Sequence, residues 1–373
     1  MVVLVAVAAC ILVWDMYFVV SGLPTPDRTQ VGVLSQSGDD SGPSSVSTPW
    51  RPDARLFPEI LSVTDATMHD GMWWILDRWG HQIHRVTPEG VLQRTFGRQG
   101  EGPGEFRNPR RIVTHADTVV VVDDRILHLF DSGGRHIADR RIGPLSWCPG
   151  ARMEAGVSSS SGLLLLVDCL DPRREDGGGR HVLLETVDAA SRSVAYKPRY
   201  RSGRVADLAS FAVVLSDHPR GFLFGSVQDE CLGLFDPLGA TLGTVCHDWI
   251  ERVPLSISRE DRENVRHLAR RYSSFGIRLE VPTHRPPFER ITTMDGDRLV
   301  YYGRVPVDRA SPHGAIAGVT TEVWRVVVRG DDGQPIRLQV PEAPILFLDG
   351  ESVLAAWDEP DGTRIAFHAL SGK

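Results

Sequence analysis

Phe96-Gly97-Arg98-Gln99-Gly100-Glu101-Gly102-Pro103-Gly104-Glu105-Phe106 is a glycine-rich stretch that lies between two segments of alternating apolar residues. A glycine loop that binds phosphate opens directly into a helix. Here the stretch leads instead into Arg111-Ile112-Val113 and then the segment 118–122, which are rich in the β-branched residues that favour strands. We therefore interpret the stretch as a connector between two β-sheets, whose glycines supply corners with positive φ.

A pattern of a polar or glycine turn followed by a short apolar run occurs in six segments of the chain. The apolar runs are 71–76, 118–122, 162–167, 221–224, 298–302 and 352–357. Each run is followed by a partner strand, at 82–86, 126–130, 182–187, 232–235, 323–328 and 365–370. Repeated strand pairs with unevenly spaced turns predict an all-β, six-bladed β-propeller.

The connector adds a resemblance to a known family. The pair Phe96-Gly97, the spaced glycines and Gly104-Glu105-Phe106 resemble the blade junction of NHL-type six-bladed β-propellers. The resemblance spans roughly Ile60 to Lys373 and is strongest from Ile75 to Gly133. It is a resemblance to exported bacterial propellers with NHL-like repeats, most of which serve as binding or interaction scaffolds.

The resemblance leaves two functions open, because fold does not fix function. The first is a binding or protein-interaction scaffold without enzymatic activity. The alternative is a metal-dependent enzyme, since some similar propellers are lactonases or lyases that use a metal on the channel axis. No nucleophile motif or other known catalytic constellation is present in the sequence, and this favours the scaffold.

The last partner strand ends close to Lys373, so the sixth blade lacks its outer strand. An exposed edge of this kind can be covered by a segment from the other end of the chain. We expect a piece of Pro49 to Leu56 to pair beside Arg364 to Leu370 and so close the ring. The predicted propeller domain is therefore 49–373.

The N-terminal segment 1–22 is predicted to be an export signal or membrane anchor. Met1 to Val20 is apolar apart from Asp15, and about 20 such residues suffice to cross a bilayer. Val7-Ala8-Ala9-Cys10 is similar to a lipoprotein cleavage box, so an uncleaved anchor, a lipoprotein and a cleaved signal all remain open. We expect an exported protein of the cell envelope, held at the membrane. The segment 23–48, rich in Ser, Gly, Pro and Asp, is predicted to be a flexible linker.

The charge of the chain limits the kinds of partner that we expect. The chain has 373 residues and a net charge of −7 that is spread along it, with no basic stripe, so a nucleic-acid partner is excluded from our expectations. A protein partner or a small anionic ligand is expected instead.

One helix is predicted at Ser258 to Tyr272, inserted between the fourth and fifth blades.

The cysteines are consistent with export. Cys148 and Cys169 lie on either side of one turn, and Cys231 and Cys246 on either side of another. Each pair could face across neighbouring antiparallel strands and form a disulfide, or all four could be buried thiols.

Acidic residues follow four of the apolar runs, at Asp77, Asp123, Asp168 and Asp358. In a propeller they would lie on one common face. Such a ring could hold calcium, which needs six to eight oxygen ligands, or its members could cap turns. We favour turn caps, with no resident metal or other cofactor. His81 and His84 are not a metal pair either, since strand residues three apart point to opposite faces.

Basic residues near the predicted channel mouth provide the binding hypothesis. Arg110 and Arg111 follow Pro109 at the start of a predicted innermost strand, and Arg290 precedes another. Arginine side chains there could recognise a carboxylate or sulfate, or could form salt bridges with the aspartates. We therefore predict a ligand-binding face that contains Arg110, Arg111, Asp77, Asp123 and Asp168.

Overall fold

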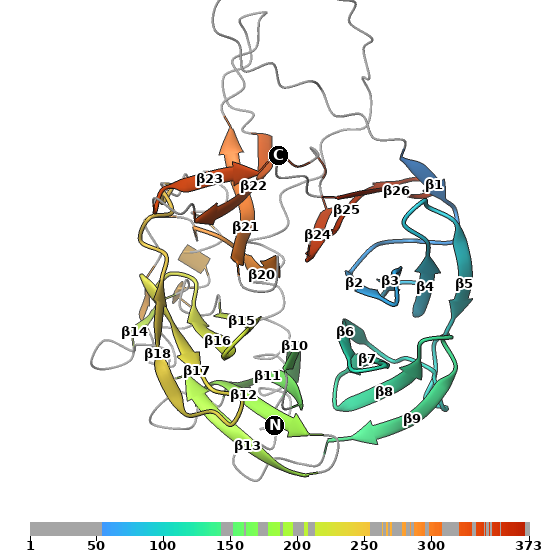
Figure 1. Cartoon of the computed structure of the whole chain (residues 1–373), viewed down its shortest axis with the longest axis horizontal. Coiled ribbons are helices and arrows are strands. Elements are labelled where there is room, and N and C mark those ends of the chain that lie inside the picture. The colour runs from blue at the N-terminus through green and yellow to red at the C-terminus, as the bar shows by residue number, and fades with distance from the viewer. Residues whose placement is uncertain are drawn as a thin grey trace, which may run out of the picture. The chain divides into compact units, whose positions relative to one another are not determined.

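The computed structural model describes residues 54–142 and 213–253 continuously and, elsewhere up to residue 369, mainly the β-strands. The chain divides into two compact units, of which the larger comprises Trp50–Leu255 and Ile277–Lys373. The described part of the larger unit consists of antiparallel four-stranded sheets, numbered I to VI here, and a short parallel pair (Figure 1). The predicted all-β propeller fold is confirmed.

Sheets I to III follow one another along the chain. Sheet I consists of β2 (Asp65–His69), β3 (Met72–Asp77), β4 (Gln82–Val86) and β5 (Leu92–Phe96). Sheet II consists of β6 (Pro109–His115), β7 (Thr118–Asp123), β8 (Ile126–Asp131) and β9 (His136–Arg141). Sheet III consists of β10 (Arg152–Ser159), β11 (Gly162–Leu170), β12 (Gly178–Thr186) and β13 (Ala189–Tyr196).

Sheets IV to VI complete the described set. Sheet IV consists of β15 (Val213–His218), β16 (Gly221–Ser226), β17 (Cys231–Phe235) and β18 (Thr241–Cys246). Sheet V consists of β20 (Arg290–Met294), β21 (Arg298–Val307), β22 (Thr321–Arg329) and β23 (Pro335–Leu338). Sheet VI consists of β24 (Ile345–Asp349), β25 (Ser352–Glu359), β26 (Gly362–Ala369) and β1 (Arg55–Phe57). The parallel pair is β14 (Val205–Asp207) with β19 (Arg278–Glu280).

The first strands of the sheets line the interior of the larger unit. β2 contacts β6, β6 contacts β10, and the contacts continue through β15, β20 and β24 back to β2. The predicted apolar runs form the second strands, which are buried; β3, for example, places Trp73 to Leu76 at no more than 1% exposure. Apolar clusters fill the space between neighbouring sheets, as between I and II, II and III, IV and V, V and VI, and VI and I.

The N-terminal side of the described chain supplies the outer strand of sheet VI. β1 pairs antiparallel with β26, with Arg55 opposite Ile365, Leu56 opposite Arg364 and Phe57 opposite Thr363. The expected pairing beside Arg364 is therefore present, and it extends one residue beyond Leu56. Phe57 is buried and joins the apolar cluster between sheets VI and I.

The glycine-rich connector links β5 to β6, as predicted, and folds back on itself. The amide of Phe106 donates to the carbonyl of Arg98 at 2.8 Å, and Phe106 is fully buried. Gly97 has φ +89°, and a Cβ atom there would lie 2.3 Å from the Phe106 ring. Gly100 differs from the expectation of a positive-φ corner, because its φ is not positive; a Cβ atom there would meet the Glu105 carboxylate.

Several expectations concern residues that the structure describes only in part. The segments 1–22 and 23–48 lie outside the described residues. Of the predicted helix at Ser258 to Tyr272, five residues are described and all are helical, namely Glu263, Arg266, His267, Ala269 and Arg270. Within the described parts of the chain, no helix has the length and apolar character needed to cross a membrane.

Candidate functional site

Two of the predicted face residues, Asp77 and Asp123, cap loops. Asp77 is fully buried and accepts hydrogen bonds from the amides of Leu61 at 2.7 Å and Gly80 at 2.8 Å. Asp123 is 2% exposed and accepts from the amides of Arg107 at 2.6 Å and Asn108 at 2.8 Å. Both carboxylates are thus buried caps of turns, the role that the sequence analysis favoured for them.

Each of these carboxylates also lies near a buried histidine of the next strand. Asp77 Oδ2 lies 3.8 Å from His84 Nε2, and Asp123 Oδ2 lies 3.5 Å from His128 Nε2. Burial raises the pKa of both aspartates, but the nearby histidine and the hydrogen bonds from the backbone amides together outweigh it, so each pKa is below its usual 3.8. Both carboxylates therefore remain charged at neutral pH and hold their loops in place.

The other predicted aspartates are described less fully. Asp358 accepts hydrogen bonds from the side-chain hydroxyls of Thr363, at 3.3 Å, and Ser62, at 3.4 Å. The backbone of Asp168 lies in β11, opposite Arg152 and Arg180, and its side chain lies outside the described set.

The structure separates the two predicted arginines. Arg110 occupies an irregular position where the register of β6 against β7 shifts, and its Nε lies 3.7 Å from Asp124 Oδ1 on the same sheet. Arg111, the next residue, reaches sheet I, where its Nη1 lies 3.6 Å from Asp65 Oδ1. Arg111 therefore contacts the neighbouring innermost strand, β2.

The convergence of charged side chains on Asp65 is the main feature of the ring interior. Arg290 Nη1, from β20, also lies 3.6 Å from Asp65 Oδ1, and the Arg290 guanidinium stacks over the Phe347 ring at 4.8 Å. Asp65 Oδ2 accepts a hydrogen bond from the amide of Ile112 at 3.0 Å. Three first strands, β2, β6 and β20, thus meet at one carboxylate.

Further acidic groups lie near this convergence. Asp349, at the end of β24, accepts from Met68 N at 2.6 Å and Thr67 Oγ1 at 2.8 Å, which ties sheet VI to sheet I. Burial raises the pKa of Asp349, and the charges of Asp217 and Asp65 raise it further. The interior that the first strands surround therefore contains both arginine and aspartate side chains.

A separate cavity of about 140 Å³ lies beside sheet II. It is lined by Gly100, Glu101, Glu105, Arg107, Asp123, Ile126, His128, Asp139 and Arg141. The cavity joins the glycine connector to Asp123, two parts of the predicted binding face. The sequence analysis missed His128, Asp139 and the adjacent His136, because their proximity depends on how β8 and β9 pair.

The structure describes one of the two predicted disulfides. Cys231 lies directly opposite Cys246 in β17 and β18, and a disulfide joins them. Cys148 and the side chain of Cys169 lie outside the described residues.

Comparisons with known proteins agree with the fold. No protein family and no curated protein matches the chain. A solved structure of a putative exported protein from Bacteroides fragilis is similar over 86% of this chain and 93% of its own, with 10% identity and a TM-score of 0.51. A member of the DUF4221 family from Bacteroides vulgatus is similar over 84% and 94%, with 13% identity and a TM-score of 0.48.

A gluconolactonase from Xanthomonas campestris is also similar, over 85% of this chain and 90% of its own, with 10% identity and a TM-score of 0.46. At these identities, a structural likeness reports the fold and not the activity. The likeness to the Bacteroides fragilis protein agrees with what the strand order shows, which is an all-β propeller fold.

Proposed function

We propose that this protein is an exported, membrane-tethered binding scaffold, built on a six-bladed NHL-like propeller, that takes up a small anionic ligand of the carboxylate or sulfate type. The ligand binds inside the ring of first strands, beside Arg111 and Arg290, and is not chemically converted. The observation that carries this proposal is the approach of these two arginines, from different sheets, to one oxygen of Asp65.

The geometry of these contacts allows a ligand carboxylate to take the place of Asp65 beside the two arginines. A separation of 3.6 Å between nitrogen and oxygen is that of an ion pair and not of a short hydrogen bond. The side chains of Arg111 and Arg290 are 29% and 32% exposed. A ligand carboxylate can therefore approach both guanidinium groups and form the shorter, charge-assisted contacts for which arginine is suited.

The six-bladed form is supported by the contacts among first strands, which return from β24 to β2. The outer strand of sheet VI comes from β1, so the ends of the ring are joined by main-chain pairing. Export to the cell envelope is supported by the apolar segment 1–20 and by the opposed Cys231 and Cys246, since disulfides persist in oxidising compartments. Mass determination of the mature protein distinguishes an uncleaved helical anchor, a lipid on Cys10 and a cleaved signal.

The alternative function is a metal-dependent, lactonase-like or lyase-like enzyme with a metal on the channel axis. Among the described residues, the group with metal-like spacing lies on β8 and β9 and not on the first strands. The scaffold proposal is therefore preferred, and the two can be separated by experiment.

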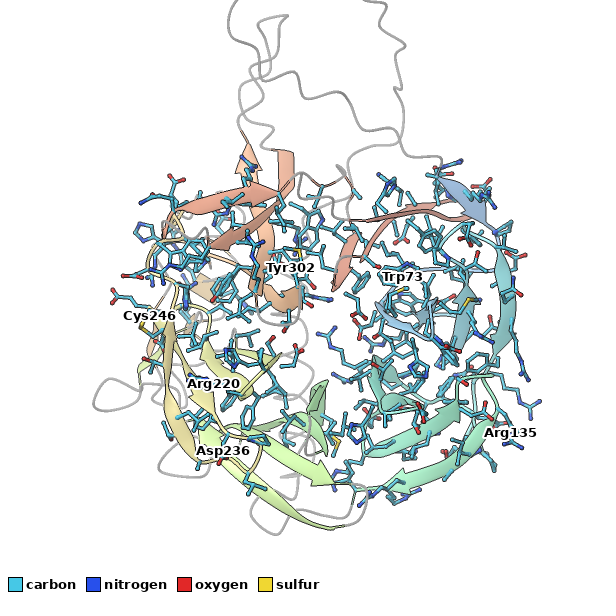
Figure 2. All side chains as sticks on the ribbon, in the orientation of Figure 1. Trp73, Arg135, Arg220, Asp236, Cys246 and Tyr302 are labelled. Atoms are coloured by element: carbon cyan, nitrogen blue, oxygen red, sulfur yellow. A yellow bond between two sulfur atoms is a disulfide. The ribbon has the colours of Figure 1, made fainter. Side chains whose placement is uncertain are left out.

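The test measures binding of citrate, acetate and sulfate to the full chain in detergent, at low ionic strength. Arg111→Ala and Arg290→Ala should each weaken binding about tenfold or more, the loss expected for a charge-assisted contact. Arg135→Ala is the matched control, because Arg135 is 82% exposed at the outer edge of sheet II and pairs with Asp131 (Figure 2). Equal affinities for all variants would overturn the proposed site, and calcium-dependent hydrolysis of a lactone would favour the enzyme.

A further inference from the structure

We propose that sheet II carries a binding site for a divalent transition-metal ion of the zinc type, formed by His128, His136 and Asp139. His128 lies on β8, and the other two lie on β9. Their ligand atoms, one from each side chain, all lie within 4.8 Å of one another. Two imidazoles and one carboxylate form a donor set that suits zinc, whereas calcium prefers oxygen ligands alone.

An irregularity in β9 places His136 and Asp139 together. Strand residues three apart normally point to opposite faces. Here His128 is opposite Asp139 and Phe130 is opposite His136, and the register shifts between Leu129 and Phe130, so Ile137 is an extra residue. A β-bulge of this kind re-aims side chains. Ile137 is 52% exposed, whereas the Asp139 carboxylate contacts both His128 and His136.

The contacts within the cluster are close to those that a metal requires. Asp139 Oδ1 lies 2.6 Å from His128 Nδ1 and 2.6 Å from His136 Nε2. Zinc–ligand bonds of ~2.0–2.2 Å in a tetrahedral site place the ligand atoms roughly 3.3 Å apart. Asp139 is the most exposed of the three residues, with a side chain that is 32% exposed, so its carboxylate can withdraw by this small amount to admit the ion.

Asp123 provides the support that zinc-bound histidines usually have. Histidine ligands commonly present their other ring nitrogen to a carboxylate, which fixes the orientation of the ring. Asp123 Oδ2 lies 3.5 Å from His128 Nε2, the nitrogen opposite the cluster. Asp123 is itself held by the amides of Arg107 and Asn108. The buried His128 ring is therefore fixed with Nδ1 directed at His136 and Asp139.

Sheet I has the same framework without the ligands. His84, on β4, lies opposite Thr95, as His128 lies opposite Asp139, and its Nδ1 contacts Thr95 Oγ1 at 2.9 Å. The register of β5 shifts at the equivalent point, so that Leu92 takes the place of His136. The aspartate–histidine pair and the bulge are thus a shared structural feature of both sheets. At the positions of Leu92 and Thr95 in sheet I, sheet II has His136 and Asp139, whose side chains can bind a metal.

The site also has room for a fourth ligand. The cavity of about 140 Å³ is lined by both His128 and Asp139, and Glu105 and Arg107 lie on its wall. A zinc ion with three protein ligands keeps a position for water or for an added ligand. That position would face this cavity, next to the glycine connector.

The experiment is a titration of the full, untagged chain with Zn²⁺ and separately with Ca²⁺ by calorimetry, with Co²⁺ as a spectroscopic probe. We expect one Zn²⁺ per chain bound tightly, with Ca²⁺ at least tenfold weaker, and an intense visible Co²⁺ spectrum of a tetrahedral site. The double variant His136→Leu with Asp139→Thr should lose this binding and remain folded, because Leu92 and Thr95 occupy the same register positions in sheet I. Asp123→Asn should weaken Zn²⁺ binding by about 10- to 100-fold.

A gain-of-site variant tests whether the same side chains bind Zn²⁺ when they are placed on sheet I. Leu92→His with Thr95→Asp should build a second site on sheet I and raise the stoichiometry from one Zn²⁺ to two. Folding of each variant is checked by its circular dichroism spectrum and its melting temperature without metal. Equal Zn²⁺ affinity and stoichiometry in the wild type and in the sheet II double variant would overturn the proposal, as would tighter binding of Ca²⁺ than of Zn²⁺.

Discussion

Arg364 donates a hydrogen bond to the carbonyl oxygen of Ala54, which lies 310 residues earlier in the chain, at 3.4 Å. The contact is part of the pairing between β1 and β26, through which the N-terminal side of the propeller covers the outer edge of sheet VI. Arg364 also forms two hydrogen bonds with Glu359, at 2.8 and 3.0 Å, on its own sheet. One side chain of β26 thus links the residue before β1 to the end of β25.

This closure predicts different effects for two short deletions. Removing 54–57 should lower the melting temperature of the full chain by about 5 °C or more, because it exposes the edge of β26 and removes the buried Phe57. Removing four residues within 23–46 is the matched control and should leave the melting temperature unchanged. Equal melting temperatures for the two deletions, measured by calorimetry, would contradict this account of ring closure.

The disulfide of sheet IV should stabilise the protein moderately. Cys231 and Cys246 are separated by 15 residues, and closing a loop of that length contributes about 3 kcal/mol in the chain-entropy treatment. Replacing both with serine should lower the free energy of unfolding by up to that amount in urea titrations. Peptide mapping without reductant should recover the pair as one bridged species from exported protein, and we expect the same of Cys148 with Cys169. Recovery of these cysteines as thiols would reject the respective bridge.

Asp77 should make stability depend on acid pH. Its pKa is lowered below 3.8, so the unfolded chain takes up the proton first as pH falls. The stabilisation is fully present above about pH 4 and is lost as pH falls through the lower, folded pKa. Asp77→Asn should cost about 1–3 kcal/mol at pH 7, by weakening the caps at Leu61 and Gly80, and should flatten the decline below pH 4. The exposed Asp117→Asn serves as the control, and an unchanged slope in Asp77→Asn would refute the assignment.

His247 should give a second pH dependence, nearer to neutrality. It is 1% exposed and packs edge-to-face on Phe288 at 4.7 Å. Burial lowers the pKa of His247 below its usual 6.5, more than its contacts with Asp229 raise it. The unfolded chain therefore binds this proton more readily, and stability falls as pH decreases below 6.5 until the folded pKa is reached. His247→Phe should be less sensitive than the wild type between pH 7.5 and 5.5 in urea titrations; equal sensitivity would contradict the prediction.

The sequence by itself determined the strand pairs and the meaning of the glycine connector. Runs such as Trp73 to Leu76 are apolar at consecutive positions, and a run of this length between turn residues is typical of a strand buried on both faces. The connector was interpretable because the residues that follow it, such as Ile112 and Val113, favour a strand and not the helix that a phosphate-binding loop needs. The close approach of the Phe106 ring to Gly97 became visible only in the structure. The opposed Cys231 and Cys246 followed from hairpin geometry, which is also local.

Only the tertiary structure decided which charged side chains meet. Arg110 and Arg111 are adjacent in sequence, and strand alternation by itself directs them to different sides. That Arg110 lies near Asp124 in the turn after β7, while Arg111 reaches Asp65 on the next sheet, depends on how the sheets are placed, which the sequence does not show. The cluster of His128, His136 and Asp139 was also hidden, since one extra residue in β9 reverses the side on which a strand residue lies. Periodicity predicts that a strand exists, whereas the position of a bulge and the stacking of one sheet on another depend on contacts between distant segments.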